Sequence, residues 1–240
     1  MSEIFKRTKL LLGEDAMEKL KASRVAVFGI GGVGGHTAEA LVRAGIGELH
    51  IIDNDTVSPS NINRQIIALH STVGKSKVDV AMERFLDINP DLKIKTYKCF
   101  YLPDENNSIF DFSDYDYVVD AIDTVSGKIG LVMECTRLGV PIISSMGTGN
   151  KTDPTLLKIS DIHKTSVCPL ARVMRYELKK RGIKKLKVVY SEETPIIPKN
   201  SEGPSKDEKG RIPPASCSFV PSVAGLLIAA EVVKDLTAQK

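Results

Sequence analysis

The chain has 240 residues, enough for one large domain with a substantial buried core. Its 42% hydrophobic and 26% charged residues lie near the averages for globular proteins, which excludes disordered, collagen-like and coiled-coil proteins. The net charge of +3 is too small to indicate nucleic-acid binding by itself. Four cysteines without a CxxC pair predict neither a structural zinc nor a disulfide framework, and we expect a cytoplasmic protein.

Short apolar segments bounded by Gly, Pro or Asp predict buried parallel strands. Their ranges are 24–29, 48–52, 93–99, 117–122 and 140–145. The helical patterns between them occupy 33–44, 74–89 and 126–138. The first twenty residues are also helical in pattern and contain no readable secretory signal. This alternation predicts an α/β fold with a doubly wound, Rossmann-like and mostly parallel sheet.

The second half is predicted to add mixed strands and helices to this sheet. The expected elements are a strand near 156–159, a helix over 166–181, a strand at 187–191 and a buried helix around 223–233. The last segment is shorter than the roughly 18 residues that a membrane span needs. Residues 192–215 contain five prolines and two glycines without periodicity, which predicts a long exposed loop.

A glycine-rich turn follows the first predicted strand in the sequence FGIGGVGG, which contains Gly29, Gly31, Gly32 and Gly34. Because glycines have no side chains, such a turn lets a phosphate approach backbone N–H groups at the start of a helix. Asp53 ends the second strand, at a spacing typical of a carboxylate that holds ribose hydroxyls. The turn therefore predicts an adenine nucleotide site, with close packing of helix and strand as the alternative.

Cationic and amide side chains follow the second strand at the edge where ligands of open α/β sheets bind. Asn61 and Arg64 lie in the segment DNDTVSPSNINRQ, and Lys77 opens the next predicted helix. A planar guanidinium suits phosphate recognition, and the ammonium of Lys77 would reach a triphosphate. The alternative is that these are solvated surface charges.

Two charged residues follow the fourth predicted strand in DAIDTVSGK. The carboxylate of Asp123 is a natural ligand for Mg²⁺ beside a triphosphate. The alternative for Asp123 is an N-cap on the following helix. Lys128 would either neutralise phosphate oxygens or pair with an acidic residue.

Together these motifs resemble the ubiquitin-activating-enzyme superfamily of ATP-dependent adenylating proteins. The resemblance is dense over residues 6–150 and rests on GxGGxGG, DNDTVSPSNINRQ, VGKSK, INP and DAIDTVSGK. The later segments DPTLLKISDIHKTSVCPLARVMRYELKKRG and SCSFVPSVAGLLIAAEVVKDL resemble the tRNA threonylcarbamoyladenosine dehydratases. The resemblance therefore extends over nearly the whole chain.

That resemblance implies ATP-dependent cyclisation of threonylcarbamoyladenosine in tRNA through an acyl adenylate. It implies catalytic roles for Arg64, Lys77 and Asp123, with Asp123 holding Mg²⁺. The ATP-binding residues that it implies are Gly29, Gly31, Gly32, Gly34, Asp53, Asn61, Arg64, Lys77, Asp123 and Lys128. Arg7 resembles an arginine that reaches the ATP of a neighbouring subunit, which implies a homodimer. A monovalent cation and an accessory sulfur-relay protein are further implied partners to which no residue is assigned.

The predicted helix over 166–181 carries a row of cations that favours tRNA binding. We expect tRNA contacts from Arg172, Arg175, Lys179, Lys180 and Lys184. A solvated helix face is the alternative for this row.

We expect one domain over 1–240, with ATP bound by 1–150 and with substrate binding and dimer support from 151–240. An adenylyltransferase for the C-terminal glycine of a ubiquitin-like sulfur carrier is the main alternative function, although such relatives generally carry zinc-binding CxxC pairs. A nicotinamide-dependent oxidoreductase would use the glycine turn and Asp53 but not Arg64 or Asp123. A non-catalytic tRNA-binding protein would not need those two residues either.

Overall fold

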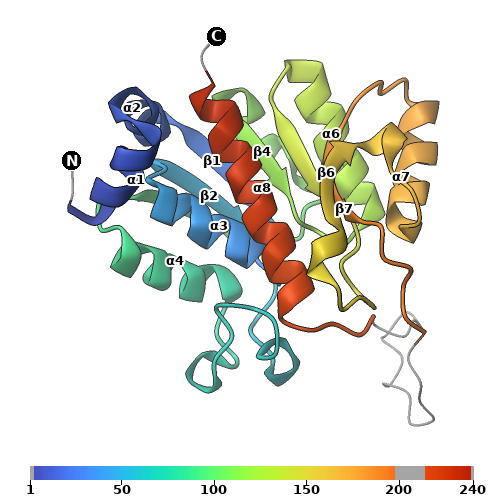
Figure 1. Ribbon diagram of the computed structural model, residues 1–240, viewed down its shortest axis with the longest axis horizontal. Coiled ribbons are helices and arrows are strands. Elements are labelled where there is room, and N and C mark those ends of the chain that lie inside the picture. The colour runs from blue at the N-terminus through green and yellow to red at the C-terminus, as the bar shows by residue number, and fades with distance from the viewer. Residues whose placement is uncertain (1–2, 198–213, 239–240) are drawn as a thin grey trace.

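Seven strands form one sheet in a computed structural model that describes residues 3–197 and 214–238 (Figure 1). The strands are β1 (Arg24–Phe28), β2 (Glu48–Ile52), β3 (Lys93–Tyr97), β4 (Tyr117–Asp120), β5 (Ile142–Ser145), β6 (Leu157–Asp161) and β7 (Lys187–Ser191). Their order is β3-β2-β1-β4-β5-β7-β6, and all neighbours are parallel except β6 and β7. The predicted doubly wound, mostly parallel sheet is confirmed.

The direction of winding changes between β1 and β4. From β1 the chain builds outward through β2 to β3, and it then returns to place β4 on the other side of β1. The loops that leave the carboxyl ends of β1 and β4 therefore diverge and open a crevice between them. This crevice is where the sheet topology places a ligand.

Helices cover both faces of the sheet. Their bounds are α1 (Lys6–Leu12), α2 (Glu14–Ala22), α3 (Gly34–Ala44), α4 (Lys77–Ile88), α5 (Pro103–Asn106), α6 (Val125–Leu138), α7 (Pro169–Lys180) and α8 (Phe219–Thr237). Figure 1 shows α8 crossing the front of the sheet beside α3, and the two helices pack closely. Val220, Ala224 and Ile228 of α8 are buried in the same core as Leu41 of α3. Among the described residues, no helix has both the length and the apolar character needed to cross a membrane.

Glycines set several helix boundaries. Gly45 and Gly139 adopt left-handed backbone conformations directly after α3 and α6, with φ of +97° and +73°. Gly13, with φ of +87°, divides the predicted N-terminal helix into α1 and α2. Gly74, with φ of +84°, does not belong to α4, which starts at Lys77 and is shorter than the predicted range 74–89.

The prediction that every parallel strand is buried is wrong for β3. This strand lies at the edge of the sheet, and its residues Lys93 and Lys95 are exposed. Charged side chains on an edge strand disfavour pairing with another chain. The strand also ends at Tyr97, two residues before the predicted boundary.

An aromatic cluster covers the opposite face of the sheet from α8 and was not predicted. The ring of Phe28 in β1 lies 5.1 Å from Tyr101, 5.3 Å from Phe110 and 5.9 Å from Phe112, measured between centroids. These partners come from the irregular segment between β3 and β4, which includes α5. Of the predicted loop 192–215, residues 198–213 lie outside the described part of the chain.

Candidate active site

A pocket of about 440 Å³ lies at the carboxyl ends of β1, β2 and β4, in the crevice where the winding reverses. Most of the predicted nucleotide-binding residues line this pocket. They are Gly29, Gly31, Gly32, Asp53, Asn61, Arg64, Lys77 and Asp123. Gly34, Lys128 and Arg7 do not line it.

The glycines of the turn divide into two groups. A Cβ atom on Gly34 would lie 1.7 Å from the carbonyl oxygen of Gly29, and one on Gly29 would lie 2.7 Å from that of Ala121. Gly34 therefore permits close approach of α3 to β1, so the packing alternative holds there. At Gly31, by contrast, a Cβ would meet only the amide nitrogen of Gln65, at 3.9 Å. Gly31 thus leaves the space that a phosphate at this turn needs.

Asp53 lies beneath the glycine turn and supports it. Its carboxylate accepts hydrogen bonds from the backbone N–H groups of Ile30, at 2.7 Å, and Asp55, at 2.9 Å. Burial raises the pKa of Asp53, and the ammonium of Lys77, 3.9 Å away, opposes this shift. The carboxylate therefore ties β2 to the turn after β1 and offers acceptor oxygens at the pocket wall.

Lys77 is held beside the pocket by two acidic residues. Its ammonium is 2.7 Å from a carboxylate oxygen of Asp55 and 3.9 Å from one of Asp53. The backbone N–H of Lys77 also donates to the backbone carbonyl of Asp55. The side chain is buried although it carries a charge. Because a buried ammonium requires compensating partners, the two aspartates fix its position at the pocket.

The loop after β2 presents Arg64 and Asn61. The side-chain oxygen of Asn61 accepts from the N–H of Ser58 at 3.0 Å and closes the short turn Pro59–Asn61. The guanidinium of the half-buried Arg64 donates to the carbonyl of Ser60 at 2.8 Å and to the side chain of Asn63 at 2.9 Å. These contacts are to neutral acceptors, so the charge of Arg64 is available to an anion.

The charged residues after β4 lie at different depths. Asp123 is exposed at the pocket, and Thr124 rather than Asp123 is the N-cap residue of α6, so the capping alternative is wrong. Lys128 is fully buried, with its ammonium 3.0 Å from a carboxylate oxygen of Asp120. The predicted contact of Lys128 with phosphate is thus wrong, and the alternative prediction, that Lys128 pairs with an acidic residue, is confirmed. An ammonium enclosed between helix and sheet is stable only with such a partner.

No described set of three or more His, Cys, Asp or Glu side chains is arranged to hold a metal ion. A magnesium ion held by Asp123 would therefore have at most one further such side chain as a ligand and would take its other ligands from phosphate and water oxygens. This mode of binding is usual for Mg²⁺ beside nucleotides. The exposed carboxylate of Asp123 fits the ion in that form.

Several pocket residues were not singled out as site residues from the sequence. Phe100 and Tyr101 line the pocket, as do Thr148 and Ser216 from the second half of the chain. Gln65 also lines the pocket, and its position after the second strand already placed it in this crevice from the sequence. Phe100 and Thr148 follow the carboxyl ends of β3 and β5, and this position after a parallel strand was the available signal. Ser216 had no comparable signal, because only the packing of the start of α8 brings it to the pocket.

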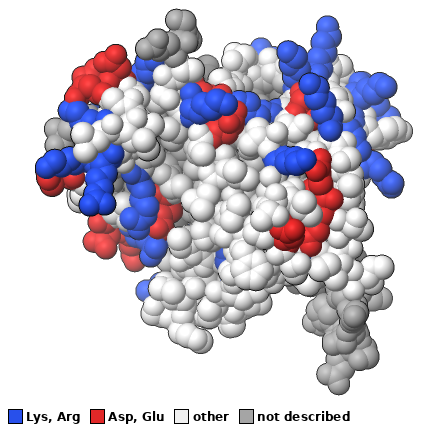
Figure 2. Space-filling view, in the orientation of Figure 1, with Lys and Arg blue, Asp and Glu red and all other residues white. Residues whose placement is uncertain are grey.

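The predicted tRNA-binding helix is α7, and most of its cations are free to face solvent. Arg172, Lys179, Lys180 and, just beyond the helix, Lys184 are exposed. Figure 2 shows Lys and Arg side chains gathered over this side of the molecule. Arg175 differs, because it is half-buried and donates to the backbone and hydroxyl oxygens of Thr165. Arg175 therefore holds the segment before α7 in place.

Arg7 lies on α1, where it is exposed. The pocket of its own chain does not include it. A contact between Arg7 and a nucleotide would therefore have to be made in another copy of the chain.

The sequence profile of the ThiF family matches residues 5–240. The chain is 46% identical over 239 residues to the tRNA threonylcarbamoyladenosine dehydratase of Bacillus subtilis, covering 97% of this chain and 94% of that protein. The solved structure of Escherichia coli tRNA N6-threonylcarbamoyladenosine dehydratase, TcdA, in complex with ATP superposes with a TM-score of 0.87 at 33% identity, covering 98% of this chain and 93% of that chain.

A relative of the main alternative class matches less of the chain. The adenylyltransferase and sulfurtransferase UBA4 of Vanderwaltozyma polyspora is 36% identical over 149 residues, which cover 62% of this chain and 34% of that protein. The resemblance to the tRNA threonylcarbamoyladenosine dehydratases predicted from the sequence is confirmed.

Proposed function

The chain belongs to the ThiF family, and we propose that it is an ATP-dependent tRNA threonylcarbamoyladenosine dehydratase. The observation that carries the proposal is one pocket that joins an open glycine turn, a buried carboxylate and cationic side chains. Gly31 comes from the turn after β1, and Asp53, Arg64 and Lys77 come from the connection between β2 and the start of α4. This combination suits a nucleoside triphosphate, and the relative of known structure with the same fold binds ATP.

The chemistry requires activation of a carboxylate, whose oxygen is a poor leaving group. The threonyl carboxylate attacks the α-phosphate of ATP and releases pyrophosphate, which yields an acyl adenylate. A nucleophile of the same modified base then displaces AMP and closes the ring, so one water is lost from the nucleoside. Because the reacting carboxylate and phosphate repel each other, the protein must orient both and neutralise their charge.

Arg64 and Lys77 supply that neutralisation in this proposal. The guanidinium of Arg64 lies in the pocket wall and provides a planar donor pair for phosphate oxygens. The ammonium of Lys77 is held in place by Asp55, so it needs little reorganisation when the nucleotide binds. Asp123 would hold Mg²⁺, and the bound ion would neutralise charge on the phosphates as pyrophosphate leaves.

The tRNA is proposed to lie along α7. Arg172, Lys179, Lys180 and Lys184 are exposed there and would neutralise backbone phosphates. Arg175 is left out of this surface because Thr165 engages its guanidinium. In this arrangement residues 151–240 supply the tRNA-binding surface and residues 1–150 supply most of the nucleotide pocket.

We also propose a homodimer in which Arg7 of one subunit reaches the ATP of the other. Mixing two inactive variants tests this arrangement. In the proposed dimer, each site takes Asp123 from one subunit and Arg7 from the other. A mixed dimer of Arg7→Ala and Asp123→Ala therefore has one intact site and should regain part of the activity. Mixtures that stay as inactive as either variant alone, after confirmed subunit exchange, would contradict the shared site. A cytoplasmic location, a monovalent cation and a sulfur-relay partner stay predictions.

AMP release tests the proposed function directly. The purified protein is incubated with MgATP and either tRNA that bears threonylcarbamoyladenosine or the same tRNA without the modification. We expect AMP only with the modified tRNA, and no AMP from the Arg64→Ala variant. AMP formation that requires a ubiquitin-like carrier protein instead would favour the sulfur-carrier alternative and contradict the proposal.

A further inference from the structure

Gln65 is a buried amide in the wall of the pocket whose hydrogen-bonding capacity is not used by the fold. Only 7% of the residue is exposed, and it directly follows Arg64. Its backbone is fixed: its N–H donates to the carbonyl of Asn61 at 2.9 Å, and its carbonyl accepts from Ala68 at 3.0 Å. The side chain therefore occupies a defined place in the wall.

The amide of this side chain has no partner that explains its burial. Its oxygen Oε1 is inaccessible and has no hydrogen-bond partner among the residues that the structure describes. A buried polar atom without a partner costs about 1–3 kcal/mol, and most such groups in native proteins are paired. The fold therefore gives this amide no hydrogen bond that accounts for its place in the pocket wall.

The other end of the amide faces the glycine turn. The nitrogen Nε2 is 3.9 Å from the position that a Cβ on Gly31 would occupy, and it is the nearest atom to that position. Gly31 is the glycine of the turn whose side is open to the pocket. An atom that approaches the backbone at Gly31 from the pocket therefore comes within reach of an amide N–H donor.

From this placement we propose that Gln65 is a further substrate-contacting residue: its Nε2 donates a hydrogen bond to a phosphate oxygen of ATP held at the Gly31 turn. The inference rests on the proposed function for the identity of the nucleotide. A neutral donor adds to the cations Arg64 and Lys77 without another charge to desolvate. The phosphate would pair only Nε2, so the cost of the unpaired Oε1 would be the same in the free and the ATP-bound protein.

This proposal predicts opposite effects on stability and on ATP binding. In Gln65→Leu an apolar side chain of similar size replaces the unpaired amide, so the Tm of the free protein should stay equal or rise. Its Kd for ATP should rise about 10- to 100-fold, the range expected for one hydrogen bond to a charged group. Gln65→Glu keeps the shape but places a carboxylate near phosphate, so ATP affinity should fall further.

Asn89→Leu is a matched control. Asn89 is another buried amide, but its oxygen accepts from the N–H of Asp91 at 3.3 Å, and it does not line the pocket. This variant should lower the Tm of the free protein and leave the Kd for ATP unchanged. The two substitutions thus separate an amide kept for a ligand from an amide kept for the fold.

The measurements are thermal unfolding with and without MgATP, and titration calorimetry with ATP in the absence of tRNA. A weaker ATP affinity in Gln65→Leu without loss of Tm supports the contact, whether or not the wild-type protein dehydrates tRNA. An unchanged Kd for ATP in Gln65→Leu overturns it, even if wild-type dehydratase activity is established. A lower Tm together with an unchanged Kd also overturns it, because the amide would then serve only the fold.

Discussion

The ammonium of Lys128 lies 3.0 Å from a carboxylate oxygen of Asp120, and neither side chain is exposed. The same ammonium donates to the carbonyl of Ile122 at 3.0 Å, and the hydroxyl of Ser144 in β5 bonds to the other carboxylate oxygen of Asp120. This buried ion pair thus connects α6, two strands and the backbone next to Asp123. It gives the loop that carries Asp123 a fixed base beneath the pocket.

Removing one partner of this pair should destabilise the fold strongly. Lys128→Met leaves the carboxylate of Asp120 buried without its cation, which costs about 3–5 kcal/mol in the free energy of unfolding. Urea denaturation of the wild type and the variant measures this loss. Adding Asp120→Asn to Lys128→Met removes the unpaired charge and should recover part of the stability. A loss below about 1 kcal/mol, within the range of an exposed ion pair, would contradict the role of the pair.

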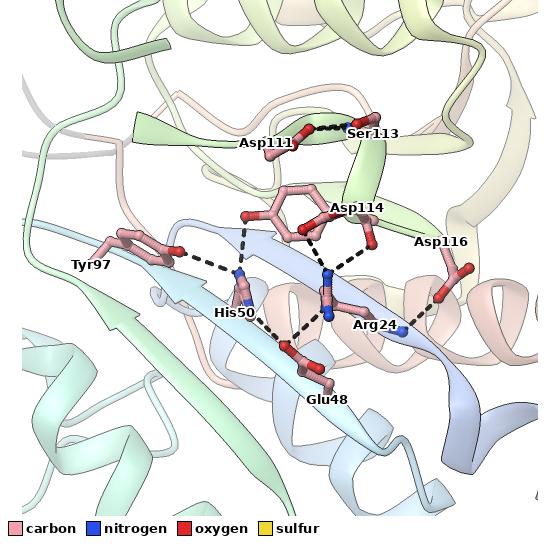
Figure 3. A network of polar contacts seen from close by, with 9 residues as sticks. Arg24, Glu48, His50, Tyr97, Asp111, Ser113, Asp114 and Asp116 are labelled. Atoms are coloured by element: carbon pink, nitrogen blue, oxygen red, sulfur yellow. Dashed lines mark hydrogen bonds and ion pairs between the residues drawn. The ribbon is translucent and has the colours of Figure 1, made fainter. Parts of the chain in front are cut away.

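A second polar network, shown in Figure 3, lies at the opposite end of the sheet from the pocket and makes stability depend on pH. His50 in β2 contacts a carboxylate oxygen of Glu48 and the hydroxyl of Tyr115, both at 3.0 Å. Burial lowers the pKa of His50 below its ordinary value, although Glu48 opposes the shift. His50 is therefore neutral in the folded protein at a pH where the unfolded chain begins to bind a proton.

Acidification should destabilise the protein through His50. The unfolded state binds more protons than the folded state once the pH falls below about 6.5, so this contribution is complete above that value and is lost as the pH falls. The urea midpoint of the wild type should decrease between pH 7.5 and pH 5.5. His50→Gln, which cannot take up the proton, should show a smaller decrease, and equal slopes in the two proteins would exclude His50 as the cause.

Asp123→Asn should change how the reaction depends on magnesium. The side chain is exposed and makes few contacts with the fold, so the free energy of unfolding should change by no more than about 0.5 kcal/mol. The Mg²⁺ concentration for half-maximal AMP release should rise at least about 10-fold, because a neutral amide is a weaker ligand than a carboxylate. Glu134→Gln, in α6 but outside the pocket and paired with Arg137, is a control that should keep the wild-type response. An unchanged magnesium response in Asp123→Asn would remove the proposed ligand.

Reversing charges on α7 should weaken tRNA binding without affecting the nucleotide. Arg172→Glu combined with Lys179→Glu removes two exposed cations and adds two anions, so tRNA affinity should fall by at least about 10-fold. The dependence of affinity on salt should also become shallower. ATP affinity should remain at the wild-type value. Equal tRNA affinity for the variant and the wild type would mean that the cations of α7 only face solvent and do not bind tRNA.

On the same helix, the direction of the Arg175 side chain was not predicted correctly by helical periodicity. Its spacing from Arg172 and Lys179 placed it on one predicted surface, yet its guanidinium turns to Thr165. The acceptors of its guanidinium are the backbone and hydroxyl oxygens of Thr165. Thr165 lies in the segment before α7, and the helical pattern does not predict where this segment packs. Arg175→Glu would therefore disturb the segment before α7, and tRNA binding by this variant would not test the surface.

The strands and most of the pocket were predictable for physical reasons. Buried parallel strands require apolar runs, and the carboxyl ends of neighbouring strands must meet at one edge. Residues such as Asp53 and Asp123 directly follow such runs, so their convergence followed from the topology. Gly31 was predictable as part of a glycine-rich turn between strand and helix.

The remaining features depend on packing that periodicity does not describe. The separate roles of Gly31 and Gly34 follow from how closely α3 approaches β1. The burial of Lys128 depends on which side of α6 faces the sheet. The burial of the Gln65 side chain, whose place at the crevice was predictable, depends on the fold of an irregular loop. The antiparallel direction of β6 depends on the connection from β5, for which the sequence offers no regular pattern.

As a dehydratase, this protein removes one water from threonylcarbamoyladenosine at the expense of ATP. The most direct measurement is the mass of that nucleoside after modified tRNA has been incubated with the protein and MgATP and then digested. We predict a product lighter by one water, formed by the wild type and absent with Arg64→Ala or without ATP. An unchanged nucleoside mass after incubation with a wild-type protein that binds both ATP and tRNA would rule out the proposed dehydratase activity.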